Sequence, residues 1–366
     1  MRILLLSAYD AASHKRWRNA LVAHLDEHQW SVETMAPRHF AWRSRGNSLH
    51  FGLARRELLA QPYDALITTS MTDLASLRGF VPELSRLPTA VYFHENQFEY
   101  PLRSGQRANL DQQLTSLYTA LCGDRLLFNS AFNRDSFLKG AGLLLAAMPD
   151  HVPPGIVNRL RERAQLLAVP LEAKCYAARG LCHGPLSIVW NHRWEYDKAP
   201  ERFFEALFQL SEHGYAFDLH VVGQSFRQVP PVFEQARERL ASHIRTWGFL
   251  ASVEAYRELL STADLVVSTA LHEFQGLAVL EAVAAGCRPL VPDRLAYREF
   301  IPEPWRYGSY PDEPAREVAA LVEALRGFCN DPESLRRSAP VNVEALSWNA
   351  LAPGYRALLA QLVRGG

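Results

Sequence analysis

The stretch ADLVVSTALHEFQGLAVLEAVAA, residues 263–285, combines an apolar run, a glycine-bearing turn and an alanine-rich segment. The run at residues 263–269 is short and contains β-branched side chains, which is typical of a strand buried on both faces of a parallel sheet. Alanine dominates residues 278–285 and favours a helix. A strand that passes through a tight turn into a helix predicts an α/β domain.

The same succession recurs along the chain. Apolar runs that end in small or polar residues, each followed by a helical pattern, predict two sets of parallel strands. The runs are residues 2–8, 65–70, 89–94 and 124–130 in the first set, and residues 186–192, 217–223, 244–249 and 263–269 in the second. Because 366 residues also exceed one ordinary core, we expect two doubly wound, Rossmann-like domains. Residues 168–185 mix Pro, Gly and Cys without a period and fit a linker between them.

Composition narrows the class of protein. No apolar run approaches the roughly 18 residues of a membrane span, and residues 3–6 are too few for the apolar core of a signal peptide. We therefore expect a cytoplasmic protein. The 5 cysteines contain no C-x-x-C pair, which predicts reduced side chains without a disulfide framework or a zinc site. The 39 basic and 39 acidic residues balance, which argues against a protein coated in nucleic acid.

Ligands of open α/β sheets bind beyond the carboxyl ends of the strands. No predicted strand is followed by G-x-G-x-x-G, and no P-loop motif occurs, so neither a dinucleotide oxidoreductase nor a P-loop enzyme is expected. In the opening stretch, the amides of Gly276, Leu277 and Ala278 come where the turn enters the helix. The first amides of a helix lack intrahelical acceptors and favour a phosphate, and a glycine lets the anion approach the backbone.

Two glutamates flank this anion site. Glu281, about one helical turn further along, could accept hydrogen bonds from the vicinal hydroxyls of a ribose. Glu273, before the turn, could bind hydroxyls on the other side of the phosphates, so that one motif would hold both ends of a nucleotide sugar. The spacing alone is equally compatible with a helix that merely carries acidic residues near its first turn.

Arg193 and Lys198 follow the first strand of the second set. They lie in a loop that opens a helix at Pro200, and two cations beside an anion-binding helix terminus suit a diphosphate. Together they could stabilise a leaving nucleoside diphosphate without a metal ion. Alone, such a pair also fits a solvated surface.

These motifs resemble those of a known family. R-x(4)-K at residues 193–198 and E-x(7)-E at residues 273–281 are similar to the retaining, metal-independent glycosyltransferases of GT-B fold, in which two Rossmann-like domains face each other across a cleft. The strings SHK, WRSR, YFHENQFEYP, FNSAFN and PDH resemble the tRNA-queuosine mannosyltransferases. The resemblance implies GDP-mannose as donor and queuosine in the anticodon loop of tRNA-Asp as acceptor, with no cofactor, no membrane and no obligate protein partner.

The resemblance also implies domain limits and further site residues. We expect an acceptor-side domain over residues 1–170, a nucleotide-sugar domain over 171–345, and a helix within 346–366 that crosses back to the first domain. The residues it assigns are His94 against the transferred sugar, backbone at Phe249 and Leu250 for the nucleobase, and Ser13 and His14 in the first loop, where Ala11 and Ala12 replace the Gly-Gly of related members. On this view Arg193, Lys198, Glu273 and His94 form the catalytic set.

Residues 37–56 contain five arginines, two histidines and three aromatic residues but no acid. Arginines contact phosphates and aromatic rings stack on splayed bases when single-stranded RNA is bound, so this stretch is a candidate RNA site. The residues expected to face the acceptor are Arg38, Trp42, Arg43, Arg45, Glu95 and Asn96. The stretch is also compatible with a solvated loop and helix whose aromatic rings point inward.

Three functions remain open from the residues. The first is a retaining glycosyltransferase that acts on tRNA, and the second is the same chemistry on a small molecule, lipid or protein. The third is a nucleotide-sugar binder without transfer activity, or an epimerase of the same fold. The paired R-x(4)-K and E-x(7)-E motifs favour transfer, and the arginines favour RNA.

Overall fold

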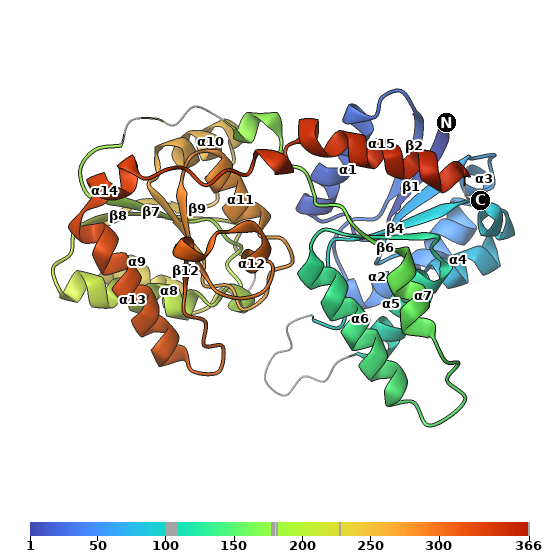
Figure 1. Ribbon diagram of the computed structural model, residues 1–366, viewed down its shortest axis with the longest axis horizontal. Coiled ribbons are helices and arrows are strands. Elements are labelled where there is room, and N and C mark those ends of the chain that lie inside the picture. The colour runs from blue at the N-terminus through green and yellow to red at the C-terminus, as the bar shows by residue number, and fades with distance from the viewer. Residues whose placement is uncertain (100–108, 177–179, 181, 227, 365–366) are drawn as a thin grey trace. The chain divides into compact units, whose positions relative to one another are not determined.

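A computed structural model describes residues 1–99, 109–176, 180, 182–226 and 228–364 (Figure 1). The chain divides into two compact units. Unit 1 contains residues 1–170 and 348–366, and unit 2 contains residues 171–347. In the described part of the chain each unit contains a six-stranded sheet whose strands pair in parallel, which confirms the predicted α/β class.

The sheet of unit 1 has the strand order β2-β1-β3-β4-β5-β6. Its strands are β1 (Arg2–Ser7), β2 (Gln29–Thr34), β3 (Ala65–Thr69), β4 (Thr89–Phe93), β5 (Arg125–Phe128) and β6 (Ala164–Leu166). The central strands β3 and β4 are buried at every position, as expected for strands covered on both faces. The edge strands β2 and β6 were not predicted, because one alternates polar and apolar residues and the other has only three residues.

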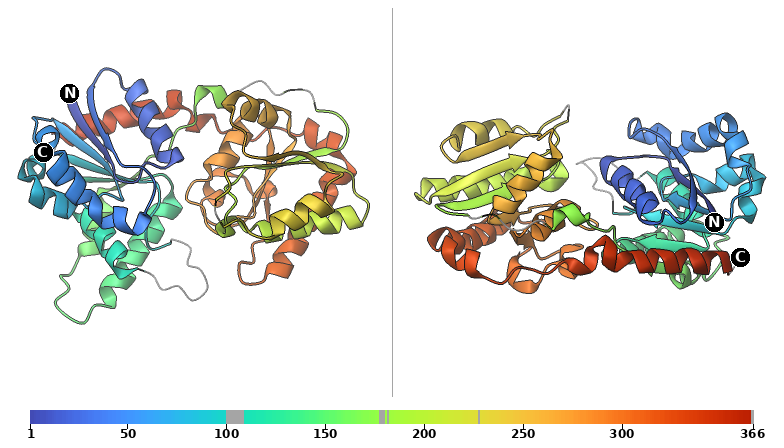
Figure 2. Two further views of the ribbon diagram at one scale, coloured as in Figure 1. Left: turned by 180° about the vertical axis from the view of Figure 1, so that it is seen from behind. Right: turned by 90° about the horizontal axis from the view of Figure 1, so that it is seen from above.

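Helices cover both faces of this sheet. They are α1 (Ala12–His24), α2 (Phe40–Leu49), the π-helical η1 (His50–Ala54), α3 (Arg56–Leu59), α4 (Leu74–Phe80), the 3-10 helix η2 (Pro82–Arg86), α5 (Leu110–Cys122), α6 (Ala131–Ala146), α7 (Ile156–Arg163) and α15 (Trp348–Arg364). The helices α1 and α15 lie on one side, and α2, α4, α5 and α6 lie on the other (Figures 1 and 2). Most of the apolar side chains of α15 are buried, and Val363 near its end is 37% exposed.

The sheet of unit 2 has the order β12-β11-β10-β7-β8-β9. Its strands are β7 (Leu186–Trp190), β8 (Phe217–Val222), β9 (Ile244–Gly248), β10 (Leu265–Val267), β11 (Arg288–Pro292) and β12 (Arg306–Tyr307). The four predicted runs of this set all form strands. The strands β11 and β12 extend the sheet beyond β10 and were not predicted.

The helices of unit 2 are α8 (Pro200–Glu212), α9 (Val232–Arg239), α10 (Val253–Thr262), α11 (Leu277–Ala284), α12 (Tyr297–Phe300), α13 (Pro314–Asn330) and α14 (Pro332–Arg337), with short 3-10 turns η3 (Ala173–Cys175), η4 (Tyr196–Lys198), η5 (Glu303–Trp305) and η6 (Glu344–Leu346). An aromatic core that includes Trp190, Phe203, Phe204 and Phe233 packs between β7, α8 and α9. Within the expected linker, Leu171 bridges to Ser347, while residues 177–179 and 181 lie outside the described residues. Among the helices that the structure describes, none combines the length and apolar character needed to cross a bilayer.

Candidate active site

The turn after β10 leads into α11 through a glycine. Gly276 has φ 82°, a left-handed conformation that favours glycine, and it forms the N-cap of α11. A Cβ atom at this position would lie 2.9 Å from a ring carbon of Tyr297, so even alanine would displace the ring. The helix begins at Leu277, one residue earlier than predicted, and its first turn, which includes Ala278, presents the backbone amides that suit an anion.

The ammonium group of Lys198 lies in a dense set of contacts. Its Nζ donates to the carbonyl of His272 at 2.7 Å and lies 3.2 Å from carboxylate oxygens of both Glu273 and Asp197. The strands β7 and β10 are neighbours in the sheet, which brings the loops after them together. The backbone amide of Leu271 donates to the Asp197 carbonyl at 2.9 Å and ties the two loops. The R-x(4)-K and E-x(7)-E motifs therefore meet through Lys198 and Glu273.

The charges around Lys198 fix protonation states. Burial by itself raises the pKa of Glu273, but Lys198, His192 and His272 outweigh burial and lower that pKa to about 2. Burial opposes the charge on Lys198, yet Glu273 and Asp197 raise its pKa. Burial and the Lys198 charge lower the pKa of His192 to about 3 and that of His272 to about 4. The cluster therefore contains charged carboxylates, a charged lysine and neutral histidines at neutral pH.

Arg193 lies closer to solvent than Lys198. Its side chain is 51% exposed, with one guanidinium nitrogen 2.6 Å from Glu195 and the other 3.9 Å from Asp197. Asp197 therefore lies between the two cations of the R-x(4)-K motif. An exposed guanidinium can reorient toward an incoming anion, whereas the buried ammonium is already held in place.

Glu281 is buried on α11, at 6% exposure. The end of β7 is attached to the same helix by Asn191, whose amide nitrogen donates to the Ala278 carbonyl at 2.7 Å and to the Tyr256 hydroxyl at 2.9 Å. Asn191, His192, Asp197 and His272 were not assigned from the sequence. The signal for three of them was the polar string NHRWEYDK, residues 191–198, which begins at the end of a predicted strand, and His272 adjoins Glu273.

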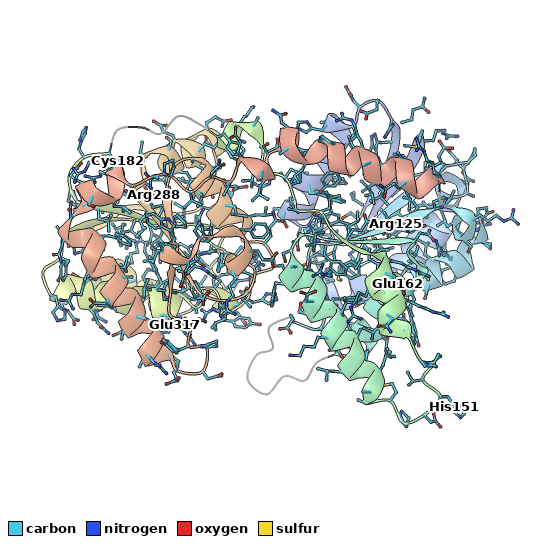
Figure 3. The ribbon with its side chains drawn as sticks, viewed as in Figure 1. Arg125, His151, Glu162, Cys182, Arg288 and Glu317 are labelled. Atoms are coloured by element: carbon cyan, nitrogen blue, oxygen red, sulfur yellow. The ribbon has the colours of Figure 1, made fainter. Side chains whose placement is uncertain are left out.

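A buried ion cluster is hydrogen-bonded to the backbone of the loop after β10. Arg294 donates to both carboxylate oxygens of Glu317 at 2.5 and 2.8 Å and to the carbonyls of Ala270 and Thr269 at 2.8 and 3.0 Å. Arg202 lies 2.8 Å from the same carboxylate. Glu317 comes from α13 (Figure 3). Burial raises the pKa of Glu317, but its hydrogen bonds with the two arginines lower it overall, so the cluster stays ionised.

The residues expected near a nucleobase follow β9. Gly248 ends this strand with φ 106°, and the next side chain, Phe249, is 69% exposed. Leu250 is half-buried. Both residues lie at the carboxyl edge of the unit 2 sheet, the edge that also bears the Lys198 cluster.

In unit 1, His94 follows β4 and is 7% exposed. Its ring centroid is 4.0 Å from that of His14, 4.6 Å from Tyr92 and 4.9 Å from Trp17, whose ring meets it edge-on. The Ser13 hydroxyl lies 3.4 Å from Nδ1 of His14. Burial lowers the pKa of His14 to about 4 and, with the neighbouring His14, holds the pKa of His94 well below its ordinary value. Both imidazoles are neutral at neutral pH.

The first loop does not need glycine. Ala11, the N-cap of α1, has φ −60° and ψ 165°, an extended conformation open to any residue. The two alanines are therefore compatible with the backbone of the loop that carries Ser13 and His14.

Asn96 was expected to face the acceptor, but the structure buries it. Its amide nitrogen donates to the Asn133 side chain at 2.9 Å and to Ser136 at 3.0 Å, and its Oδ1 accepts from the amides of Phe98 and Glu99. Asn96 therefore shapes the loop after β4 and does not offer its amide to a ligand. Glu95 is half-buried, and its carbonyl accepts from the Ser70 hydroxyl at 3.3 Å. Residues 100 and 101 of the YFHENQFEYP string lie outside the described residues.

Residues 37–56 include no acidic residue, but acidic side chains from other segments pair with three of the arginines. Arg45 lies 3.1 Å from Asp73 and 3.5 Å from Asp111, and Arg55 and Arg56 pair with Glu33 and Glu83. Aromatic residues of the stretch divide between interior and surface. Phe51 is buried, Phe40 contacts the ring of Tyr9 edge-on, and Trp42 is 58% exposed.

Trp42 lies over Gly46, where a Cβ atom would be 2.4 Å from the indole ring. One ring face is therefore supported by the helix and the residue as a whole remains exposed. Arg38 is exposed and Arg43 is half-buried, and neither forms an ion pair with a described carboxylate. His151 of the PDH string lies in the connection between α6 and α7, with its side chain 94% exposed (Figure 3).

The structure thus gathers the predicted residues into two sets, one in each unit. Unit 2 contains Arg193, Lys198, Phe249, Leu250, Glu273, Gly276, Leu277, Ala278 and Glu281, and unit 1 contains Ser13, His14, Arg38, Trp42, Arg43, Arg45, His94, Glu95 and Asn96. Across the described residues, no group of three or more His, Cys, Asp or Glu side chains is arranged to hold a metal ion.

Each half of the chain matches a known protein family. Residues 2–171 match the family described as tRNA-queuosine alpha-mannosyltransferase N-terminal, and residues 186–331 match Glycosyl transferases group 1. A tRNA-queuosine alpha-mannosyltransferase of Drosophila melanogaster is 31% identical over 96% of this chain and 95% of its own length. A GDP-mannose-dependent alpha-(1-6)-phosphatidylinositol dimannoside mannosyltransferase of Mycobacterium tuberculosis is 24% identical over 90% of this chain and 82% of its own.

Among solved structures, sucrose-phosphate synthase from Thermosynechococcus elongatus superimposes with a TM-score of 0.78 and 16% identity, covering 100% of both chains. At that identity the likeness shows the GT-B fold and no more. The sequence relationship over nearly the full length is what establishes the family. The chain belongs to the tRNA-queuosine alpha-mannosyltransferase family, within the group 1 glycosyltransferases of GT-B fold.

Proposed function

We propose that this chain transfers mannose from GDP-mannose to queuosine in the anticodon loop of tRNA-Asp. The observation that carries the proposal is the buried ammonium of Lys198, held by Glu273 and Asp197 near the turn that opens α11. The ammonium is charged and held in place at this turn before a ligand arrives. Family membership supports the rest, because the Drosophila relative bears the name of this reaction. The proposal places the chain in the cytoplasm and requires no protein partner.

The donor end of the reaction follows from the charges of unit 2. As the bond between mannose C1 and the diphosphate oxygen breaks, negative charge grows on the leaving diphosphate. Lys198 and Arg193 stabilise that charge, Lys198 from a fixed position and Arg193 from the surface. Glu281, buried one turn into α11, accepts from the ribose hydroxyls, and Glu273 accepts from hydroxyls of the mannose.

The stereochemistry is retention, because the mannose of GDP-mannose is alpha-linked and the family forms an alpha product. The acceptor oxygen forms its bond to C1 on the face from which the diphosphate leaves. The proton of the acceptor hydroxyl passes to the departing phosphate oxygen, which leaves from the same face of the sugar. We assign His94 to the transferred sugar. Its imidazole is neutral, so it serves as a hydrogen-bonding group that adds no charge to the sugar.

We assign the RNA contact of unit 1 to Trp42 with Arg38 and Arg43. An exposed indole supported on one face by Gly46 offers a stacking platform for a splayed base. The two arginines remain for phosphates, because Arg45 already pairs with Asp73. A small number of phosphate contacts predicts moderate affinity and a shallow dependence on salt.

The RNA contact is tested by filter binding of tRNA at several salt concentrations, beside a thermal melt. Replacing Arg38 and Arg43 together by alanine should reduce the slope of log affinity against log salt by about 0.7 to 0.9 for each residue. Trp42→Ala should weaken binding by roughly 1 to 3 kcal/mol with the slope unchanged. An unchanged slope for the double variant would exclude this surface, and a lower melting temperature for Trp42→Ala without a loss of binding would make its ring structural.

The function is tested by incubating the protein with a panel of nucleotide sugars and tRNA, and then measuring the mass of each nucleoside. We expect a hexose increment on queuosine, with GDP-mannose only. Transcript tRNA, which lacks queuosine, is the control and should gain nothing. A hexose that appears only on a small-molecule diol would support the alternative acceptor class, and donor binding without transfer would support a binder. Either result would overturn the proposal.

A further inference from the structure

The ring of His94 is held by other rings. Its Nε2 atom is buried and has no hydrogen-bond partner among the described residues. The three contacts that orient the ring are His14, Tyr92 and Trp17, at centroid distances of 4.0, 4.6 and 4.9 Å. A side chain held by packing alone takes whatever orientation its neighbours allow. The position of His94 therefore depends on what fixes Trp17 and Tyr92.

Both neighbours are fixed by hydrogen bonds near one hydroxyl group on the last helix. The indole Nε1 of Trp17 donates to the Tyr355 hydroxyl at 3.0 Å, and that hydroxyl donates to the Ala168 carbonyl at 3.0 Å. The Tyr92 hydroxyl donates to the Leu167 carbonyl at 2.7 Å and lies 3.5 Å from that of Tyr355.

These contacts join distant parts of the sequence. Trp17 belongs to α1, Tyr92 to β4 and Tyr355 to α15, so the hydroxyl of the last helix is separated from Trp17 by 338 positions. All three side chains are at most 2% exposed. Trp17 and Tyr92 also pack on one another, with centroids 4.3 Å apart. Burial raises the pKa of Tyr355 far above neutral pH, so its hydroxyl keeps its proton and can accept from Trp17 while donating to Ala168.

We propose that Tyr355 is a positioning residue for His94, acting through Trp17 and Tyr92. The inference rests on the proposed assignment of His94 to the transferred sugar. If the Tyr355 hydroxyl is lost, the buried indole N–H of Trp17 has no acceptor there, and the indole shifts toward another. Because the two rings pack at an interplanar angle of 82° with centroids 4.9 Å apart, the imidazole then turns with it. An error of about 1 Å in a reacting group can lower turnover by up to about 100-fold.

The test is Tyr355→Phe, which removes one oxygen and keeps the ring. We expect the kcat for mannosyl transfer to fall about 10-fold, within that limit, while the KM for GDP-mannose stays within about twofold. In the free protein, the imidazole resonances of His94 should shift. Leu362→Val is the matched control, because Leu362 is buried two turns further along the same face of α15. It should lower the melting temperature and leave kcat and the His94 resonances unchanged.

A double-mutant cycle with His94→Ala separates this inference from the proposed function. If Tyr355 acts through His94, Tyr355→Phe should have little further effect on kcat in the His94→Ala background. An equal loss of kcat in both backgrounds would overturn the inference and leave the assignment of His94 intact. Unchanged His94 resonances in Tyr355→Phe would also overturn it. If His94→Ala itself keeps full kcat, the assignment to the sugar fails, and the shift of the His94 resonances still decides whether Tyr355 positions the ring.

Discussion

Replacing Lys198 by methionine removes one charge from the centre of the proposed donor site and keeps most of the side-chain volume. In the native protein, the lysine lies 3.2 Å from each of two carboxylates, those of Asp197 and Glu273. The variant leaves both carboxylates without the ammonium. Breaking a buried ion pair by removing one partner costs about 3–5 kcal/mol, because the remaining charge is desolvated and uncompensated.

The pKa of Glu273, which Lys198 lowers together with His192 and His272, bears on the same cost. The difference between the ordinary pKa of 4.5 and the pKa of about 2 in the folded protein corresponds to roughly 3 kcal/mol in favour of the charged carboxylate. The side chain of Glu273 is 20% exposed, so water screens part of this energy. A depressed carboxylate pKa stabilises the fold above pH 4.5, and this contribution is lost as the pH falls toward 2. We therefore expect Lys198→Met to lower the free energy of unfolding by about 3 kcal/mol at pH 7.

The assay is denaturant unfolding at pH 7 and at pH 4. In the variant, Glu273 is buried without its cation, so its pKa rises and the group takes up a proton near pH 4. The destabilisation should then be smaller at pH 4 than at pH 7. Adding Glu273→Gln to Lys198→Met should recover part of the loss at pH 7. A destabilisation below about 1 kcal/mol, or the same loss with and without Glu273→Gln, would refute the reasoning.

Two further predictions concern the ligands of unit 2. Arg193→Ala should raise the activation free energy of turnover by roughly 2 to 4 kcal/mol. Its side chain is 51% exposed, so the melting temperature should change little. Arg326→Ala, at an equally exposed position, should change neither turnover nor melting temperature. In calorimetry, Glu281→Gln should weaken the binding of both GDP and GDP-mannose. Glu273→Gln should weaken the binding of GDP-mannose only. GDP should bind this variant equally or more tightly, because Lys198 loses a competing carboxylate. Parallel losses for both ligands in both variants would contradict this division of roles.

The central strands of both sheets could be predicted because strands covered on both faces are predominantly apolar. The missed strands are at or beside sheet edges. Strand β2 alternates residue types, β6 and β12 have three and two residues, and β11 begins with an arginine and ends with a proline. Short edge segments carry too few apolar residues to exceed the signal of a loop. Their positions follow from pairing with a neighbour, which sequence composition does not encode.

The proximity of Lys198 and Glu273 could be predicted more readily than the ion pairs of the arginines at residues 37–56, for a physical reason. Lys198 and Glu273 lie directly after neighbouring strands, and parallel strands deliver such residues to the same edge of a sheet. The arginines at residues 37–56 have no such constraint. Their partners come from other segments, such as Asp73 for Arg45 and Glu33 for Arg55, so local sequence could not show which arginines are already neutralised. The burial of Asn96 could not be predicted for the same reason, because its partner Asn133 lies on a different element.

The membership of α15 in unit 1 has a consequence for biosynthesis. A ribosome releases residues 1–170 long before residues 348–364, and everything between them belongs to unit 2. Until α15 has been made, the nascent first unit lacks the Tyr355 hydroxyl that accepts from Trp17 and lies beside Tyr92. Unit 2 is one contiguous segment of the chain, so it can finish folding before unit 1 has received α15. A chain that terminates before Tyr355 would therefore lack this contact in unit 1, although unit 2 would already be complete.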